Sequence, residues 1–385
     1  MSDLPLTPFT RIIESAGSEN YSWFDFNGFK FADIVRDPVA DVSAGRNGVA
    51  FQDVSPMMKF LVKGKDAPQF LDLVSTRKLS HLKPGRVAYF LMVNEDGFVR
   101  DDGTAYRLAE DEYLIQSVSN LTRWLEGHKG QLDVAISEVQ ARWAEISIYG
   151  RQSAAFLKAA GIEGLETLKP FDFRWITYDG VELMLSRTGF SGGLGYELLI
   201  PWDDAESVLK NVLAAGGAEK VTFTGNFTGV TLRLDIGFLI PGWDFPVPGG
   251  EAADPDAFRT PYDMGWDWLV QLDNREDFIG KRALSAIKES GPRFAFFALL
   301  FDGTVDPASL PGSAVRDASG KDIGHVIIAG YSASIEKFVA FCNVAAGSAA
   351  AGEQVMAGPE GAPATLSAFP LIEIPERSLT PPPGI

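Results

Sequence analysis

The amino-acid sequence predicts an α+β fold with a β-rich C-terminal unit. Two observations lead to this prediction. Short apolar runs typical of strands are mixed with amphipathic stretches typical of helices through most of the chain. From Phe294 onward, strands separated by turns predominate. With 385 residues, 46% of them hydrophobic and 22% charged, the chain is long enough for two or three domains and a large core.

Each expected element rests on a local pattern. Asp66 can cap a helix, and residues 203–215 place apolar side chains on one helical face. The expected elements, in order, are a strand over 60–64, a helix over 67–74, a strand over 87–93, a turn over 94–97, a hairpin of 104–108 and 112–117, a helix over 121–127, a strand over 146–150, and helices over 152–160, 203–215 and 281–289.

A glycine-rich loop over 186–198 is the most informative segment. Four glycines within seven residues exclude a helix. The mostly apolar run that follows, 196–200, is typical of a strand. The loop therefore delivers one carboxylate, Glu197, into an apolar strand, where it costs stability unless a donor pairs with it. A hairpin turn with Glu197 on the solvent face is the alternative.

A second feature is the adjacent pair Asp101 and Asp102, which follows the turn at Gly97. Successive residues of a strand point to opposite faces, so only one of the two carboxylates can face a common pocket. The other faces solvent or caps a backbone amide. Taken alone, such a pair near a turn is most often simply solvated.

Charge and residue counts exclude several classes of function. A net charge of −17 argues against nucleic-acid binding, which needs clustered Lys and Arg. His81, His128 and His325 are far apart, so no metal site is expected. The single cysteine, Cys342, lies in an apolar run and fits an inert thiol in a reducing compartment. No signal-peptide pattern or membrane-length apolar run is present, so we expect a cytoplasmic protein without membrane contact.

Five segments between about residues 50 and 285 match the motifs of one family in the right order. They are 51–57 (FQDVSPM, similar to FDVSHM), 89–102 (similar to YSGMLNxxGGVIDD), 187–197 (similar to RTGYTGEDGFE), 232–237 (LRLDIG, similar to LRLEAG), and 260–261 with 277–284 (similar to TP and DFIGREAL). The chain thereby resembles the glycine-cleavage T-protein (aminomethyltransferase) family. The last hundred residues resemble that family's C-terminal barrel only loosely.

This resemblance implies a tetrahydrofolate-dependent one-carbon transferase. It also implies a three-domain cloverleaf around a central folate channel. Two interwoven folate-binding domains are expected over 1–285 and a β-barrel-like domain over 286–385.

The resemblance also assigns roles to individual residues. Asp102 matches the family's catalytic aspartate near the reactive folate nitrogen, with Asp101 beside it, and Tyr89 matches an aromatic residue that lines the same site. Glu197 matches the family's pterin-binding glutamate. A pterin ring presents an amide N–H beside an amino group, and this donor pair suits a bidentate carboxylate.

Three further residues in these motifs are expected to bind the cofactor: Phe190, Tyr196 and Arg233. Arg233 is either a pocket cation or an ordinary structural arginine. Phe190 stands where the family has tyrosine, so one hydroxyl is missing from the folate pocket.

Other departures narrow the reaction. Residues 228–230 (TGV) replace the family's ARD, which removes a buried arginine and aspartate, and Pro56 replaces the histidine of SHM. The opening over 6–10 is more similar to the tetrahydrofolate-dependent demethylase branch, such as dimethylsulfoniopropionate demethylase, which also lacks ARD. We therefore expect methyl transfer from a small sulfonium, ammonium or methyl-ether donor to N5 of tetrahydrofolate, without a lipoyl carrier protein.

Two alternatives remain at this point. One is an aminomethyltransferase of a glycine-cleavage-type system, and the other is a non-catalytic folate-binding paralogue, against which the intact acidic pair argues. Trp243, Trp266 and Trp268 are candidates to contact a cationic methyl donor. Core packing is the alternative role for these three tryptophans. The sequence names neither the donor nor the oligomeric state.

Overall fold

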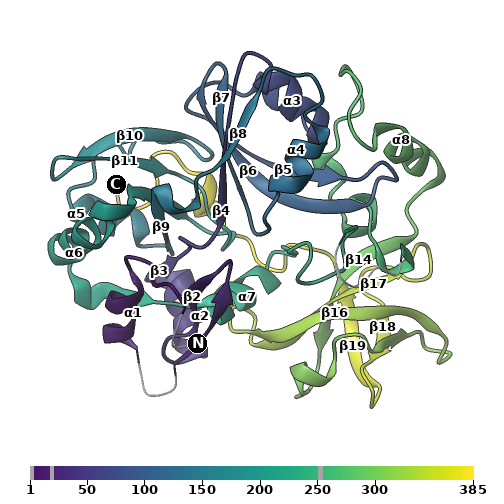
Figure 1. Cartoon of the computed structure of the whole chain (residues 1–385). Coiled ribbons are helices and arrows are strands. Elements are labelled where there is room, and N and C mark those ends of the chain that lie inside the picture. Colours follow the sequence, from purple (N-terminus) through teal and green to yellow (C-terminus); the bar gives the residue numbers. More distant parts are fainter. Residues whose placement is uncertain (1–3, 18–20, 250–254) are drawn as a thin grey trace.

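The computed structural model describes residues 4–17, 21–249 and 255–385, which form three lobes (Figure 1). One lobe is built on a six-stranded sheet, the second on a five-stranded sheet, and the third is a closed barrel of six strands. The predicted α+β fold with a C-terminal β-barrel is confirmed.

The six-stranded sheet has the strand order β10-β11-β12-β9-β3-β13, and only β13 runs parallel to its neighbour. Its strands are β3 (Val49–Asp53), β9 (Trp143–Tyr149), β10 (Phe173–Tyr178), β11 (Val181–Ser186), β12 (Gly195–Pro201) and β13 (Val221–Phe223). Around them lie α1 (Thr10–Ala16), α2 (Pro38–Asn47), α5 (Ser153–Ala159), α6 (Ala205–Gly216) and α7 (Asn226–Leu234).

Alternation along the strands separates the two faces of this sheet. Ile146 and Leu198 belong to the hydrophobic core that includes α5 and α6. The residues that alternate with these along β9 and β12, such as Ser147 and Glu197, point to the other face. Part of that other face is covered by α2 and α7, which pack on Tyr149.

The five-stranded sheet has the order β5-β6-β7-β4-β8. Its strands are β4 (Met58–Lys63), β5 (Val87–Val93), β6 (Val99–Ala109), β7 (Glu112–Ser117) and β8 (Ala135–Glu138). Apolar residues of one face pack against α3 (Ala67–Val74) and α4 (Thr122–His128). A separate hairpin is formed by β1 (Ser22–Phe26) and β2 (Phe29–Ile34).

The helix α3 has the predicted bounds, but the prediction that the Asp66 side chain caps it is wrong. Asp66 precedes the helix without making a side-chain capping bond. Its carboxylate instead accepts the backbone N–H of Asp133 at 2.8 Å, which ties the helix start to the loop before β8.

The barrel consists of β14 (Phe294–Phe301), β15 (Ala314–Arg316), β16 (Asp322–Ser332), β17 (Lys337–Ala345), β18 (Gln354–Ala357) and β19 (Ala362–Ser367). Cys342 lies in its core, and burial raises the pKa of the thiol. The expected division after residue 285 falls inside α8 (Lys281–Ser290). A division of the chain into domains over 1–285 and 286–385 stays a prediction.

After the barrel, the chain returns to the six-stranded lobe (Figure 1). The guanidinium of Arg187 donates to the backbone oxygens of Leu379 at 2.6 Å and Arg377 at 3.2 Å. Arg151 forms an ion pair of 2.6 Å with Glu376. The C-terminal tail, residues 368–385, therefore holds the start of the glycine-rich loop at Arg187.

Candidate functional site

Two rows of mostly polar side chains cross the two sheets, each on the face opposite the main helical layer. The strand register of the five-stranded sheet aligns Tyr89, Thr104, Gln116 and Lys59. The register of the six-stranded sheet aligns Ser186, Glu197, Ser147 and Gln52.

Hydrogen bonds join the two sheets along these rows. The Tyr106 hydroxyl, from β6, donates to Oε2 of Glu197 at 3.0 Å. Gln116 Nε2 donates to Oε2 of Glu145 at 2.9 Å, and Lys59 Nζ lies 3.1 Å from the same oxygen. All five residues are buried, so the facing surfaces form a polar seam inside the protein.

Both hydrogen bonds that hold the Glu197 carboxylate end on the same oxygen, Oε2. Besides Tyr106, the Thr188 hydroxyl donates to Oε2. No described residue forms a hydrogen bond with Oε1. Burial, followed by the negative charge of Glu145, raises the pKa of Glu197 to about 7. With an exposed fraction of 9%, Glu197 does not face solvent, and its second oxygen is suited to receive N–H donors.

Asp102 has a similar arrangement at the other end of β6. The Tyr89 hydroxyl donates to its Oδ2 at 2.7 Å, and no described residue forms a hydrogen bond with Oδ1. Burial, followed by the charge of Asp101, raises the pKa of Asp102 to about 7, and Asp244 adds to the effect. A buried carboxyl that titrates near neutral pH can hold or release a proton during a reaction.

Asp101 lies on the opposite face of β6 and accepts the backbone N–H of Asp102 at 2.8 Å. Burial raises the pKa of Asp101 to about 6, while the hydroxyls of Ser117 and Ser119 act in the opposite direction. Asp101 therefore influences Asp102 through its charge and through the backbone, and only Asp102 shares a face with Tyr89.

An aromatic cluster adjoins Asp102. The ring of Tyr89 lies 5.8 Å from Phe238 and 6.3 Å from Trp268, measured between ring centroids. Trp268 is 61% exposed, so this cluster opens to solvent. Trp266, in contrast, is buried against Phe245 and has the packing role.

Arg233 is engaged in an ion pair. Its guanidinium donates to both carboxylate oxygens of Asp244, with 2.9 Å between Nη2 and Oδ1, and to the backbone oxygen of Phe238 at 3.1 Å. Since Asp244 influences the pKa of Asp102, this pair lies near the acidic site. The structure gives Arg233 a partner within the protein.

The contacts of the remaining expected residues are with other side chains. Tyr196 neighbours Glu197 in sequence, so its side chain points to the opposite face of β12 and enters the hydrophobic core. The structure does not bring it to the seam. Phe190 lies against Tyr149, with 5.6 Å between ring centroids. Trp243 packs against Phe26 of the first hairpin at 5.4 Å.

Several residues of the seam were not expected from sequence: Tyr106, Thr188, Glu145, Lys59 and Gln116. Alternation from Asp102 along β6 would have placed Tyr106 on the same face. No sequence signal pairs Lys59 with Glu145, because 86 positions separate them and they come from different sheets.

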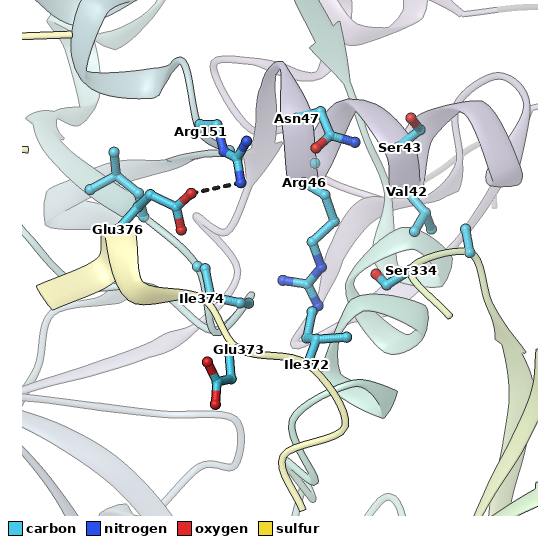
Figure 2. A pocket seen from close by; sticks show the side chains of 15 residues that line it. Val42, Ser43, Arg46, Asn47, Arg151, Ser334, Ile372, Glu373, Ile374 and Glu376 are labelled. Atoms are coloured by element: carbon cyan, nitrogen blue, oxygen red, sulfur yellow. Dashed lines mark ion pairs between the residues drawn. The ribbon is translucent and has the colours of Figure 1, made fainter. Parts of the chain in front are cut away.

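A pocket of about 290 Å³ lies elsewhere, between α2, the glycine loop and the C-terminal tail (Figure 2). Arg46 lies in its centre, where it pairs with Asp235 at 2.8 Å and donates to the backbone oxygen of Ser191 at 2.6 Å. Neither Asp102 nor Glu197 lines this pocket, so we do not assign the chemistry to it.

Across the described ranges, no helix has both the length and the apolar character needed to cross a membrane. Within the same ranges, no group of three or more His, Cys, Asp or Glu side chains is placed to hold a metal ion.

Comparison with known proteins identifies the family. The model of the GCVT N-terminal domain matches residues 11–274. The chain belongs to the GCVT family. An aminomethyltransferase of Clostridium botulinum (strain Langeland) is 31% identical over 351 residues, which cover 89% of this chain and 90% of that protein. One from Thermotoga maritima is also 31% identical, covering 70% and 72%.

A crystal structure of the glycine cleavage system aminomethyltransferase T from Bartonella henselae shares the GCVT fold. Its TM-score is 0.83 at 22% identity, with 96% of this chain and 99% of that chain covered. As a GCVT member the chain is a one-carbon transferase whose cofactor is tetrahydrofolate, as its motifs predicted. The names of its relatives agree better with the alternative reaction, aminomethyl transfer, than with the expected demethylation.

Proposed function

We propose that this chain transfers a one-carbon unit to N5 of tetrahydrofolate, with Glu197 binding the pterin and Asp102 acting at the reacting nitrogen. One observation carries the proposal. Two buried carboxylates face the space between the sheets, and each has one oxygen held by a tyrosine and one without a hydrogen bond from a described residue.

The residues at Glu197 fit a pterin. The amide N–H and amino group of the ring form a donor pair that a carboxylate can receive. Tyr106 of the five-stranded sheet and Thr188 of the glycine-rich loop fix the carboxylate from two sides, so its position is set before the ligand arrives. Donation from the ligand stabilises the charged form of Glu197, whose pKa is otherwise raised.

The residues at Asp102 fit a proton-handling role. Tetrahydrofolate, when bound, supplies the N5 nitrogen that accepts the one-carbon unit. Asp102 accepts or orients the proton of that nitrogen, and its pKa of about 7 lets it exchange this proton near neutral pH. Tyr89 fixes the orientation of the carboxylate through Oδ2. An ionised Asp102 also stabilises positive charge that develops close to it.

Two donors are candidates. The names of the relatives favour an aminomethyl group, which a lipoyl carrier protein would present. The exposed aromatic cluster of Tyr89, Phe238 and Trp268 beside Asp102 favours a small methylated cation, since aromatic faces attract sulfonium and quaternary ammonium groups. The chain also lacks a large run of basic residues for an acidic carrier, because its densest candidates, 77–78 and 281–282, are only pairs.

The donor is tested by supplying tetrahydrofolate with small sulfonium, ammonium and methyl-ether compounds and no carrier. Formation of 5-methyltetrahydrofolate establishes the demethylase reaction. Carrier-dependent formation of methylenetetrahydrofolate, with no product from any methylated compound, establishes the aminomethyltransferase reaction. For a cationic donor, Trp268→Ala should raise KM, while Trp243→Ala, which removes an aromatic ring packed on the hairpin, serves as the control.

The pterin site is tested by calorimetric titration with tetrahydrofolate. Glu197→Gln keeps the shape but replaces one acceptor with a donor. We expect the binding free energy to weaken by about 1.5–3 kcal/mol, the scale of a charged hydrogen bond. Glu206→Gln, at an exposed position of α6, is the control. Unchanged affinity in Glu197→Gln would remove Glu197 from the pterin site.

A further inference from the structure

Two residues that depart from the family motifs, Gly229 of α7 and Phe190 of the glycine-rich loop, lie next to each other. A Cβ atom at Gly229 would lie 2.9 Å from Cε2 of Phe190 and 3.3 Å from Oε1 of Gln52. No side chain can enter at position 229 unless both neighbours move. The glycine in place of the ARD arginine and the phenylalanine in place of the RTGY tyrosine therefore belong to one rearranged region, which also contains Gln52.

The amide of Gln52 is oriented within this region. Its Oε1 accepts the Tyr149 hydroxyl at 3.3 Å, and that hydroxyl lies 2.7 Å from Oγ1 of Thr224. Within the described part of the chain, Nε2 has no hydrogen-bond acceptor. Gln52 is only 5% exposed, so this unused amide donor belongs to a largely buried side chain.

Ser147 lies between Gln52 and Glu197 in the strand register. Its side chain is fully buried, and its Oγ has no partner among the described residues. Leaving a buried hydroxyl unpaired is unfavourable, and a bound ligand or water that pairs with it would remove this cost. Ser147 and Gln52 thus place two unused polar groups on the same face as the free oxygen of Glu197.

We propose that Ser147 and Gln52 are binding residues of the folate pocket and extend the recognition row that begins at Glu197. The three residues come from neighbouring strands about 4.8 Å apart and share one face. The row presents a carboxylate acceptor, a hydroxyl and an amide donor. This pattern suits a flat heterocycle with N–H donors at one end and carbonyl or ring-nitrogen acceptors beyond it, which is the chemistry of a pterin. The inference rests on the proposed folate site.

The first test measures tetrahydrofolate affinity and folate-free stability in the same variants. Ser147→Ala should raise the Kd by about 2- to 10-fold, the effect of one neutral hydrogen bond. Because the variant removes an unpaired buried hydroxyl, the Tm of the folate-free protein should stay unchanged or increase. A merely structural serine would lower the Tm and leave the Kd unchanged, and that result would overturn the proposal. Gln52→Leu should raise the Kd over the same range.

The second test uses two glycines in helices. Gly229→Ala should raise the Kd because it displaces Phe190 and Gln52. Gly127→Ala, in α4, meets nothing within 4 Å and should leave the Kd unchanged. An unchanged Kd in Gly229→Ala would count against the rearranged region as part of the pocket.

Glu197→Gln separates this inference from the proposed function. If Glu197→Gln weakens binding but Ser147→Ala and Gln52→Leu do not, the folate site stands and the extended row is wrong. If Ser147→Ala and Gln52→Leu weaken binding but Glu197→Gln does not, the binding roles of Ser147 and Gln52 stand and the assignment of Glu197 as the pterin anchor fails.

Discussion

The regions around Glu197 and Asp102 share one design but differ in how the charge is supported. Each carboxylate accepts a tyrosine hydroxyl, and burial, followed by the charge of a second carboxylate nearby, raises its pKa. At Glu197 the second carboxylate, Glu145, is paired with the buried Lys59. At Asp102 the adjacent Asp101 forms no ion pair with a described residue, and its pKa is lowered by the Ser119 hydroxyl, the backbone N–H of Asp102 and the charge of Arg100.

This difference indicates a division of labour. Glu197 receives one donor from the five-stranded sheet and one from the glycine-rich loop, and the nearby Glu145–Lys59 pair is neutral overall, so its position is fixed and suits binding. Asp102 has a single side-chain donor and a charged neighbour, so its protonation responds more readily to what binds beside it.

The largest effect is expected from Lys59→Met. This variant leaves Glu145 as an unpaired charge in the seam, which typically destabilises a protein by about 3–5 kcal/mol. Urea unfolding measures the loss. Lys63→Met, which breaks the partly exposed pair with Glu112, should cost less than about 1 kcal/mol. Equal effects of the two variants would show that the seam does not depend on the buried pair.

Next in size is Asp102→Asn, which removes the proton acceptor while preserving shape. We expect kcat to fall by about 10²-fold or more, with thermal unfolding unchanged or slightly improved. Asp101→Asn should reduce kcat less, because Asp101 lies on the other face of β6. Near-normal turnover in Asp102→Asn would overturn the catalytic assignment.

The pH dependence of stability follows from the pKa of Glu197. Its value of about 7 in the folded protein exceeds the usual 4.5, so the folded state binds more protons than the unfolded state between these values. The stability contributed by this group is therefore present at low pH and lost as the pH rises through about 7. Between pH 5 and pH 8, the free energy of unfolding of the native chain should fall by on the order of 2 kcal/mol more than that of Glu197→Gln. If the unfolding free energies of the two proteins depend on pH in the same way, this pKa is contradicted.

The smallest effect distinguishes the two tyrosines. The Tyr89 bond lowers the pKa of Asp102, so Tyr89→Phe should raise that pKa further and move the acidic limb of the kcat profile upward by about 0.5–1 pH unit. Tyr106→Phe should weaken folate binding and leave this limb in place. If both variants shift the limb equally, the two carboxylates do not have separate roles.

Sequence motifs led to the two carboxylates, but they did not reveal the seam that joins them. Tyr106 and Glu197 are 91 positions apart and meet only because two sheets face each other. Tyr196 shows a limit of motif transfer, since simple alternation beside Glu197 already predicts the opposite face. Arg233 belongs to a matching motif, yet its partner Asp244 comes from a loop eleven residues later, which no strand or helix pattern indicates.

The fold shows a similar contrast. Helix α3 follows from its amphipathic spacing, and its bounds were predicted correctly. Helix α7 was not predicted, because residues 228–231 (TGVT) are poor helix formers. It forms in the folded protein since Leu232 packs with Val42 and Tyr149 in a buried cluster. Tertiary packing, which the local sequence does not contain, overrides propensity there.

The bond between Arg187 and the C-terminal tail also bears on how the protein is made. Arg187 is 3% exposed, and three of its acceptors lie about 190 positions later, at Arg377, Leu379 and Thr380. Domains generally begin to fold while the ribosome is still translating. A nascent chain that has already formed the six-stranded sheet still lacks these acceptors, so the lobe that contains Glu197 acquires its final packing only after residues 377–380 have been translated.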